Sequence, residues 1–272
     1  MHQVPLALID DANVATKHFI NTFQNRTDGA LTRPGEVEPE MFLVSRSGGK
    51  TDLKKIFHFS HDLLDTDFVH RWRADMSQAD SYHFNMMAKL HNRLNDFAIC
   101  FIRELEASYP DLFAPSVVAN VRASMEEVLP YSTTTTRGLW YPSHSGQRGA
   151  KGHLDRSLLT LHCGDSGGEL RGHPIWNGDS AFPTSPEKGD ILIFAGVKML
   201  YATRGRILPL WHSATTAKDE DRHALVHFVH TDVGVRVVDA EETYEQYCHA
   251  HRHDPVAFYN DWWEATKMGG RD

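Results

Sequence analysis

The sequence has few cysteines and lacks long apolar runs. Its 272 residues include three cysteines, Cys100, Cys163 and Cys248, which are far apart and odd in number. A disulfide framework is therefore not expected, and a reducing compartment fits. No apolar stretch approaches the roughly 20 residues that span a bilayer, and the short N-terminal apolar run lacks the basic flank of a signal peptide. We expect a cytoplasmic protein without membrane contact.

Positive charge is scarce relative to negative charge. The chain has 28 Lys and Arg against 36 Asp and Glu, a formal net charge of −8 at pH 7. Nucleic acids and anionic membranes need a basic surface, so neither is the expected main partner. With 41% hydrophobic and 24% charged residues, the composition is that of an ordinary globular protein. A small molecule is the expected partner, and no feature indicates an oligomeric state.

A long helical pattern precedes a β-rich region. A helix is expected at about 77–108, because apolar residues recur there at helical spacing and Pro110 follows. Residues 5–9 predict a short buried strand, followed by a helix that begins at Asp10 or Asp11. From about residue 129, short apolar segments alternate with turns, and twelve of the 19 glycines lie between Gly138 and Gly205. The strands expected there are 133–141, 158–163, 169–171, 191–195, 211–215 and 224–230.

This organisation predicts one domain, mainly β with flanking helices. Many short strands with glycine-rich turns are typical of an all-β sandwich or barrel. No stretch has the composition of an interdomain linker. The expected parts are a helical N-terminal layer at about 1–128, a β core at about 129–238 and a C-terminal helical segment at 239–272.

His153, Asp155 and His212 have the pattern of an iron site. Residues i and i+2 of a strand point to the same face, so His153 and Asp155 can reach one metal ion together. A distant histidine on a strand that closes over the first would complete the two-histidine, one-carboxylate ligand set of Fe(II) sites. His212 is the candidate. Such a site leaves open positions on the metal for O₂ and a co-substrate.

Arg222 lies ten residues after His212, a distance that one hairpin can span. It would then lie on the neighbouring strand and point to the same interior. Its planar and permanently charged guanidinium can bind a carboxylate through two hydrogen bonds. A 2-oxo acid that chelates iron needs such a cation for its far carboxylate. The structural alternative for Arg222 is an ion pair with one of the acidic residues at 219–221.

Several segments around these residues follow a recurring pattern. They are Arg137-Gly138-Leu139-Trp140-Tyr141-Pro142 for R-x-N-x-Y-P, Gly152 to Leu161 for G-x-H-x-D-x-x-x-L-T-L with one residue fewer after the glycine, Gly167 to Leu170 for G-G-L, Gly189 to Leu192 for G-D-x-L, and Thr203 to Arg206 leading to His212 for S-N-G-R-x-x-S-x-x-H. Together they resemble the Fe(II)/2-oxoglutarate-dependent dioxygenase superfamily, in the branch that includes isopenicillin N synthase and the plant oxygenases. The resemblance is strong over 137–222 and weak in the N-terminal half, where 51–58 is similar to D-x-K-E-x-F.

The resemblance implies a double-stranded β-helix core, the cupin-like jelly-roll. It implies Fe(II) as cofactor, 2-oxoglutarate as co-substrate and O₂ as oxidant. Residue by residue, it matches His153, Asp155 and His212 to the iron ligands, Arg222 to the residue that binds the co-substrate carboxylate, and Tyr141 to its hydroxyl partner.

Two positions depart from the family pattern. The family's R-x-S reads Arg222-His223-Ala224, so the serine that helps to hold the co-substrate is absent, and the asparagine of R-x-N-x-Y-P is Leu139. Arg137, Leu139 and Tyr141 should share one strand face, which makes Arg137 and Leu139 candidates for substrate contact. Arg204 is a further candidate for a substrate carboxylate.

The function expected from these features is oxidation of a small organic molecule, such as an amino acid or a natural-product intermediate. The leading expectation is hydroxylation with release of succinate and CO₂. The alternative is an iron oxidase like isopenicillin N synthase, which forms a ring or a double bond without 2-oxoglutarate. A non-catalytic jelly-roll that binds a small acid or a metal is the third interpretation.

Overall fold

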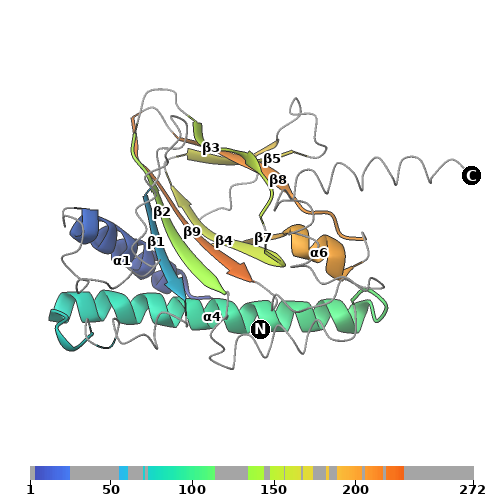
Figure 1. The fold of residues 1–272 in the computed structure, drawn as a ribbon, viewed down its shortest axis with the longest axis horizontal. Coiled ribbons are helices and arrows are strands. Elements are labelled where there is room, and N and C mark those ends of the chain that lie inside the picture. The colour runs from blue at the N-terminus through green and yellow to red at the C-terminus, as the bar shows by residue number, and fades with distance from the viewer. Residues whose placement is uncertain are drawn as a thin grey trace, which may run out of the picture.

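The computed structural model of the chain consists of two facing β-sheets with helices on one side (Figure 1). The described residues are 4–24, 55–60, 70, 73–113, 134–143, 148–155, 157–166, 168–173, 182–183, 189–203, 206–216 and 219–229. The helices that frame the site are α1 (Leu6–Gln24), α4 (Gln78–Ser108) and α6 (Val197–Ala202). The strands are β1 (Lys55–Ser60), β2 (Thr135–Tyr141), β3 (Arg148–His153), β4 (Leu159–Ser166), β5 (Gly168–His173), β6 (Phe182–Pro183), β7 (Leu192–Ala195), β8 (Trp211–Thr216) and β9 (Arg222–Val229). The C-terminal helical segment expected at 239–272 lies outside the described residues.

The strands pair in an order that joins distant parts of the chain. One sheet has the order β1-β2-β9-β4-β7 and the other the order β3-β8-β5-β6. Every pairing between neighbouring strands is antiparallel. Two antiparallel sheets with such long-range pairing make a jelly-roll. The expected fold class is therefore confirmed, and each of the six expected strands is present.

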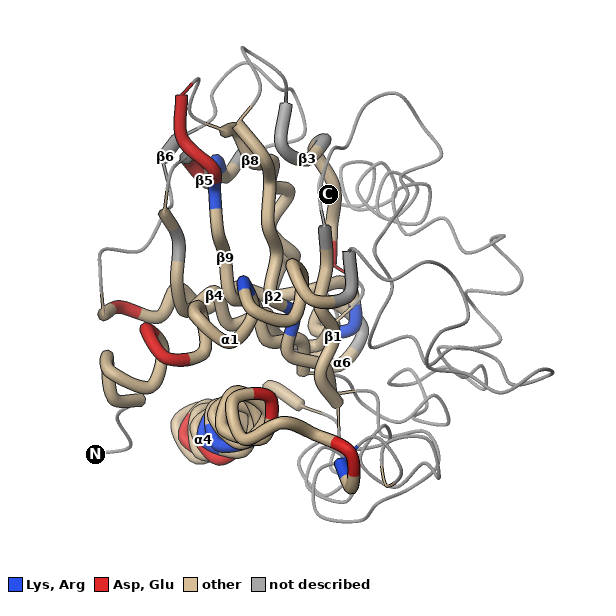
Figure 2. The backbone as a smooth tube through the Cα atoms, turned by 90° about the vertical axis from the view of Figure 1, so that its left-hand side faces the viewer, with Lys and Arg blue, Asp and Glu red and all other residues tan. Residues whose placement is uncertain are grey.

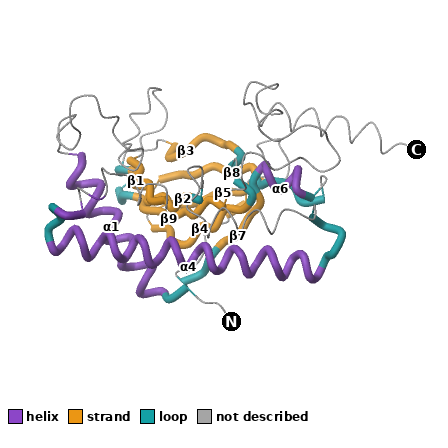
Figure 3. Tube along the Cα trace, turned by 60° about the horizontal axis from the view of Figure 1, so that its bottom comes forward, coloured by secondary structure: helices purple, strands orange, loops and turns teal. Residues whose placement is uncertain are grey.

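Helices α1 and α4 cover the outer face of the five-stranded sheet (Figure 3). The Ser77 hydroxyl caps α4 by accepting a hydrogen bond from the Asp80 backbone N–H at 3.1 Å. Met87, Leu90 and Leu94 of α4 are fully buried, which confirms the helix and its apolar stripe. These side chains form the larger hydrophobic core together with the outward-facing residues of the sheet.

The N-terminal half differs from the sequence prediction in two places. The strand expected at residues 5–9 is wrong, because this run belongs to α1. Ile9 is buried on the same helical stripe as Ala12, Phe19 and Ile20, so the helical period extends through the apolar run. The N-terminal half also contributes β1, an edge strand that pairs with β2.

The sheets carry few charged residues compared with α4. Figure 2 looks along α4, where acidic and basic residues alternate on the surface, while most strand residues are uncharged. None of the helices in the described ranges has the length and apolarity needed to cross a membrane.

Candidate metal centre

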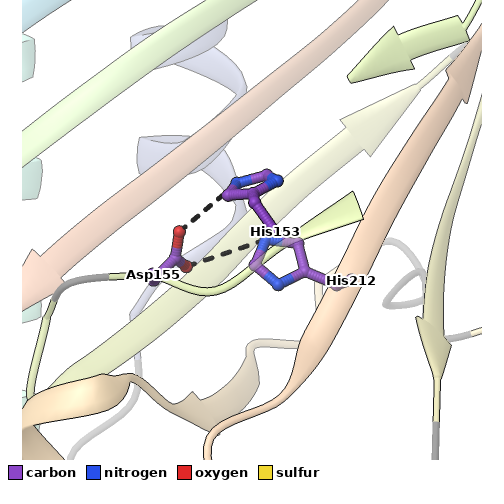
Figure 4. Close-up of side chains that lie close together, drawn as sticks. All are labelled: His153, Asp155 and His212. Carbon is purple, nitrogen blue, oxygen red and sulfur yellow. Dashed lines mark ion pairs between the residues drawn. The ribbon is translucent and has the colours of Figure 1, made fainter. Parts of the chain in front are cut away.

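His153, Asp155 and His212 converge between the two sheets. His153 ends β3, Asp155 follows it by two residues, and His212 lies on β8 directly opposite His153 in the strand register. Asp155 Oδ1 is 3.6 Å from His153 Nε2, and Asp155 Oδ2 is 3.8 Å from His212 Nε2 (Figure 4). One ligand atom from each residue lies within 4.8 Å of the others, so a single ion can bind all three. The structure thus brings the three expected metal ligands together.

The protonation states of this cluster suit a metal ion. His212 Nδ1 is 3.0 Å from the Leu210 carbonyl oxygen, which can only accept, so Nδ1 carries the proton and Nε2 offers a lone pair. Burial lowers the pKa of His212 and so favours its neutral form. Burial alone would raise the pKa of Asp155, but the two histidines and the Thr160 hydroxyl outweigh it and lower that pKa. An ionised carboxylate and a neutral imidazole are the forms in which these side chains can donate a lone pair to a metal ion.

Backbone and hydroxyl contacts fix the segment that carries Asp155. Thr160 Oγ1 donates to Asp155 Oδ2 at 2.7 Å, and the Val197 N–H donates to the Asp155 carbonyl oxygen at 2.8 Å. Gly196 lets the start of α6 approach this segment closely, because a Cβ at residue 196 would lie 2.1 Å from the Ser157 carbonyl oxygen. The carboxylate is therefore held by its own strand and by the start of α6.

Gly196→Ala is expected to lower the free energy of unfolding by about 1–3 kcal/mol and to weaken metal binding. The added methyl group meets backbone, which cannot rotate away, so the Asp155 segment must shift. Chemical denaturation and metal titration measure the two effects. Gly164→Ala is the control, because its nearest neighbours would lie at 3.2 Å and are side-chain atoms. Equal effects of the two substitutions would contradict this explanation.

A cavity of about 370 Å³ extends from the metal ligands between the sheets. It is lined by His153, Asp155, His212, Arg222, Tyr141, Arg137 and Leu139. The shared face expected for Arg137, Leu139 and Tyr141 on β2 is thus present. Among the expected site residues, Arg204 lies outside the described residues.

Arg222 and Tyr141 form one end of this cavity. They are direct partners in the pairing of β9 with β2, and the Arg222 guanidinium carbon lies 4.9 Å from the centre of the Tyr141 ring. Arg222 is 1% exposed although it carries a permanent charge. The Asp221 carboxylate, which was one alternative partner, accepts a hydrogen bond from the Ser143 backbone N–H at 2.7 Å. A buried guanidinium stacked on an aromatic ring and facing a cavity suits an anionic ligand.

Arg137 lies on the same wall, opposite Val226 of β9. Its Nε donates to His58 Nδ1 at 3.3 Å, and its guanidinium carbon lies 4.7 Å from the centre of the Phe228 ring. Burial and then the Arg137 charge lower the pKa of His58 to about 3, so His58 is neutral and can accept this hydrogen bond. These contacts orient a second guanidinium towards the cavity.

His162 is a cavity residue that the sequence reasoning did not identify. It lies on β4 two residues after Thr160, and the alternation of a strand directs it to the same interior. It is 3% exposed. Burial, followed by the charges of Arg222 and His212, lowers its pKa to about 3 against an opposing effect of Asp155. The available signal was strand parity within the Leu-Thr-Leu-His segment that follows Asp155.

The buried His162 makes stability depend on pH. Its pKa is lowered from 6.5 to about 3 in the folded protein, so between these values the unfolded chain binds a proton that the folded protein does not. The free energy of unfolding of the metal-free protein should therefore fall as pH drops below 6.5, by up to about 1.4 kcal/mol per pH unit from this residue. Urea unfolding at several pH values measures how the free energy of unfolding changes with pH. This pH dependence should be weaker in His162→Leu than in the wild type, by the contribution of about one bound proton. Parallel slopes would contradict this assignment.

Solved structures with this architecture include several oxygenases. No family model matches the chain, and no curated protein matches its sequence. JOX2, solved with 2OG, Fe and JA, is 13% identical, with a TM-score of 0.63 over 90% of this chain and 70% of that chain. The rice dioxygenase for auxin oxidation is 16% identical, with a TM-score of 0.59 over 92% and 82%. A Caulobacter crescentus protein assigned to the 2OG-Fe(II) oxygenase family is 18% identical, with a TM-score of 0.55 over 89% and 80%.

The chain has the 2OG-Fe(II) oxygenase fold. The residues at its centre also fit the two groups that such an oxygenase uses. Two imidazoles and one carboxylate on one side of an ion are the donor set for Fe(II). A buried arginine in the same cavity fits the distal carboxylate of 2-oxoglutarate. The isopenicillin N synthase-like branch remains a prediction from the sequence segments.

Proposed function

We propose that the protein is an Fe(II)/2-oxoglutarate-dependent dioxygenase that hydroxylates a small organic molecule. The observation that supports this most strongly is a single cavity lined by His153, Asp155, His212 and the buried Arg222. The reaction consumes 2-oxoglutarate and O₂, places one oxygen atom in the substrate and the other in succinate, and releases CO₂. Bound iron supplies the oxygen activation.

Each residue of the cavity has a definite task in this reaction. His153, Asp155 and His212 would hold the ion on one face and leave the opposite face to ligands. A single carboxylate leaves the centre net positive, which favours an anionic chelator. Arg222 would bind the far carboxylate of 2-oxoglutarate, and Tyr141 would place its hydroxyl beside it. Orientation of the substrate then decides which carbon reacts.

The cavity supports a substrate of modest size that carries a negative charge. Its volume of about 370 Å³ lies near the lower end for ligand sites. Arg137 would bind an acidic group of the substrate, since its Nε contact and Phe228 already hold the guanidinium in one orientation. Leu139 would form the apolar wall beside it. An amino acid or another small carboxylic acid fits, and Arg204 stays a sequence prediction for the same role.

One feature favours a second candidate, an iron oxidase that does not use 2-oxoglutarate. Ala224 lies on the same strand face as Arg222, where the family has a serine, and it is 1% exposed. In that reaction Arg222 would bind a carboxylate of the substrate itself. Ring closure or desaturation would follow without succinate.

Succinate formation separates these candidates. The Fe(II)-loaded protein should convert 2-oxoglutarate to succinate under air, and the rate should rise with a matching small acid. Oxygen uptake without succinate would favour the oxidase, and neither signal with iron bound would favour the non-catalytic binding module. Asp155→Ala is the control for iron-independent decay of 2-oxoglutarate.

A further inference from the structure

Position 224 lacks the hydrogen-bonding side chain that the family pattern has there. Ala224 lies on the same strand face as Arg222, two residues after it, and offers only a methyl group. A carboxylate bound by one guanidinium has further lone pairs, and leaving these unsatisfied in a buried cavity is costly. The Tyr141 hydroxyl can satisfy one of these lone pairs, and a donor in place of the missing serine would satisfy another.

His162 lies on β4, the strand next to β9, within reach of the space beside Ala224. In the pairing of β4 with β9, His162 is opposite Val226, which makes Ala224 its diagonal neighbour on the same face. Diagonal neighbours lie about 7–8 Å apart, which an aromatic side chain can bridge. The register shifts between His162 and Gly164, so the direct partner of Ala224 on β4 is Asp165 and His162 is its diagonal neighbour before the shift.

The side chain of His162 is 3% exposed and lines the same cavity as Arg222, His212 and Asp155. A neutral imidazole carries one N–H, which can donate to a carboxylate or keto oxygen. Bulk water cannot compete for this donor.

We propose that His162 binds 2-oxoglutarate. It would provide the hydrogen bond that the serine of the family's R-x-S pattern makes, because this chain has Ala224 at that position. The inference rests on the proposed function. Arg222 contributes the charge and His162 contributes a directed N–H from the adjacent strand. The co-substrate is then held from β9 and β4 together, and its affinity depends on a histidine.

Calorimetric titration of 2-oxoglutarate into Mn(II)-loaded protein tests this without turnover. His162→Leu should raise the Kd for 2-oxoglutarate at least about tenfold, because a hydrogen bond to a charged group is lost. His162→Gln retains an N–H donor and should stay within about threefold of the wild type. If His162→Leu does not fold, His162→Met has a similar size and also lacks the donor. The Kd for Mn(II) should be unchanged in each variant.

The double variant His162→Leu with Ala224→Ser provides the sharpest check. Serine at position 224 should recover most of the lost affinity in the His162→Leu background and add little to the wild type. A Kd for 2-oxoglutarate within about twofold of wild type in His162→Leu would overturn the role of His162. Parallel weakening of Mn(II) and 2-oxoglutarate would also overturn it, because that pattern indicates a general structural role. Failure of the wild type to bind 2-oxoglutarate would overturn the proposed function itself.

Discussion

Replacing Asp155 with alanine should abolish Fe(II) binding, with a loss of affinity of at least about a hundredfold. Asp155 supplies the only carboxylate of the cluster that the described residues form, and its carboxyl pKa is lowered by the histidines and Thr160. The remaining imidazoles, His153 and His212, would hold the ion through two bonds and without a compensating negative charge. Because outer contacts alone typically change metal affinity 10- to 100-fold, loss of a direct ligand should exceed that range.

Metal titration of purified apoprotein measures this loss, with Mn(II) as an air-stable substitute for Fe(II). Thr160→Val is the graded control, since it removes the 2.7 Å hydrogen bond to Asp155 Oδ2 but leaves the carboxylate in place. It should weaken binding about tenfold. Circular dichroism should show that both variants fold. An Asp155→Ala variant that binds the metal as tightly as the wild type would exclude this cluster as the metal site.

Arg222→Ala should remove 2-oxoglutarate binding and leave metal binding intact. The side chain is 1% exposed, lies over the Tyr141 ring and lines the cavity that holds the metal ligands. A loss of at least about a hundredfold is expected, because no neutral side chain can replace a bidentate contact to a carboxylate. Under anaerobic conditions the visible charge-transfer band of the Fe(II) protein with 2-oxoglutarate should disappear.

Two further variants separate the contributions of Arg222 and Tyr141 to 2-oxoglutarate binding. Arg222→Lys keeps the charge but loses the planar fork, so it should retain weak binding. Tyr141→Phe keeps the ring under the guanidinium and removes only the hydroxyl, so a loss of about tenfold or less is expected. If Arg222→Ala showed the charge-transfer band at the same 2-oxoglutarate concentrations as the wild type, the co-substrate would have to bind elsewhere.

The candidate metal ligands could be predicted because they lie in short segments with fixed local geometry. His153 and Asp155 are two residues apart at the end of a strand. The hairpin expected between His212 and Arg222 is wrong, because β8 and β9 belong to different sheets. The ten-residue step instead crosses from one sheet to the other, and both side chains still line one cavity. Strand alternation also placed Arg137, Leu139 and Tyr141 on one face correctly. These inferences need only the periodicity of strands.

The features that sequence reasoning missed depend on how distant segments pair. Strand parity places His162 on the same face as Thr160, but only the pairing of β4 with β9 brings this face beside Arg222. The edge strand β1 pairs with β2 across a long stretch of sequence. The sequence alone therefore does not distinguish β1 from the helical layer expected at about 1–128. The apolar run at residues 5–9 fits a strand or a helix, because so short a run has no unambiguous period.

Anaerobic titration of the Fe(II)-loaded protein with 2-oxoglutarate tests the central claim most directly, because it needs no knowledge of the substrate. A metal held by His153, Asp155 and His212 beside Arg222 should give a weak visible absorption band that grows with 2-oxoglutarate and saturates at one equivalent per chain. Protein with iron bound that shows no such band, and no succinate after oxygen is admitted, would contradict the account.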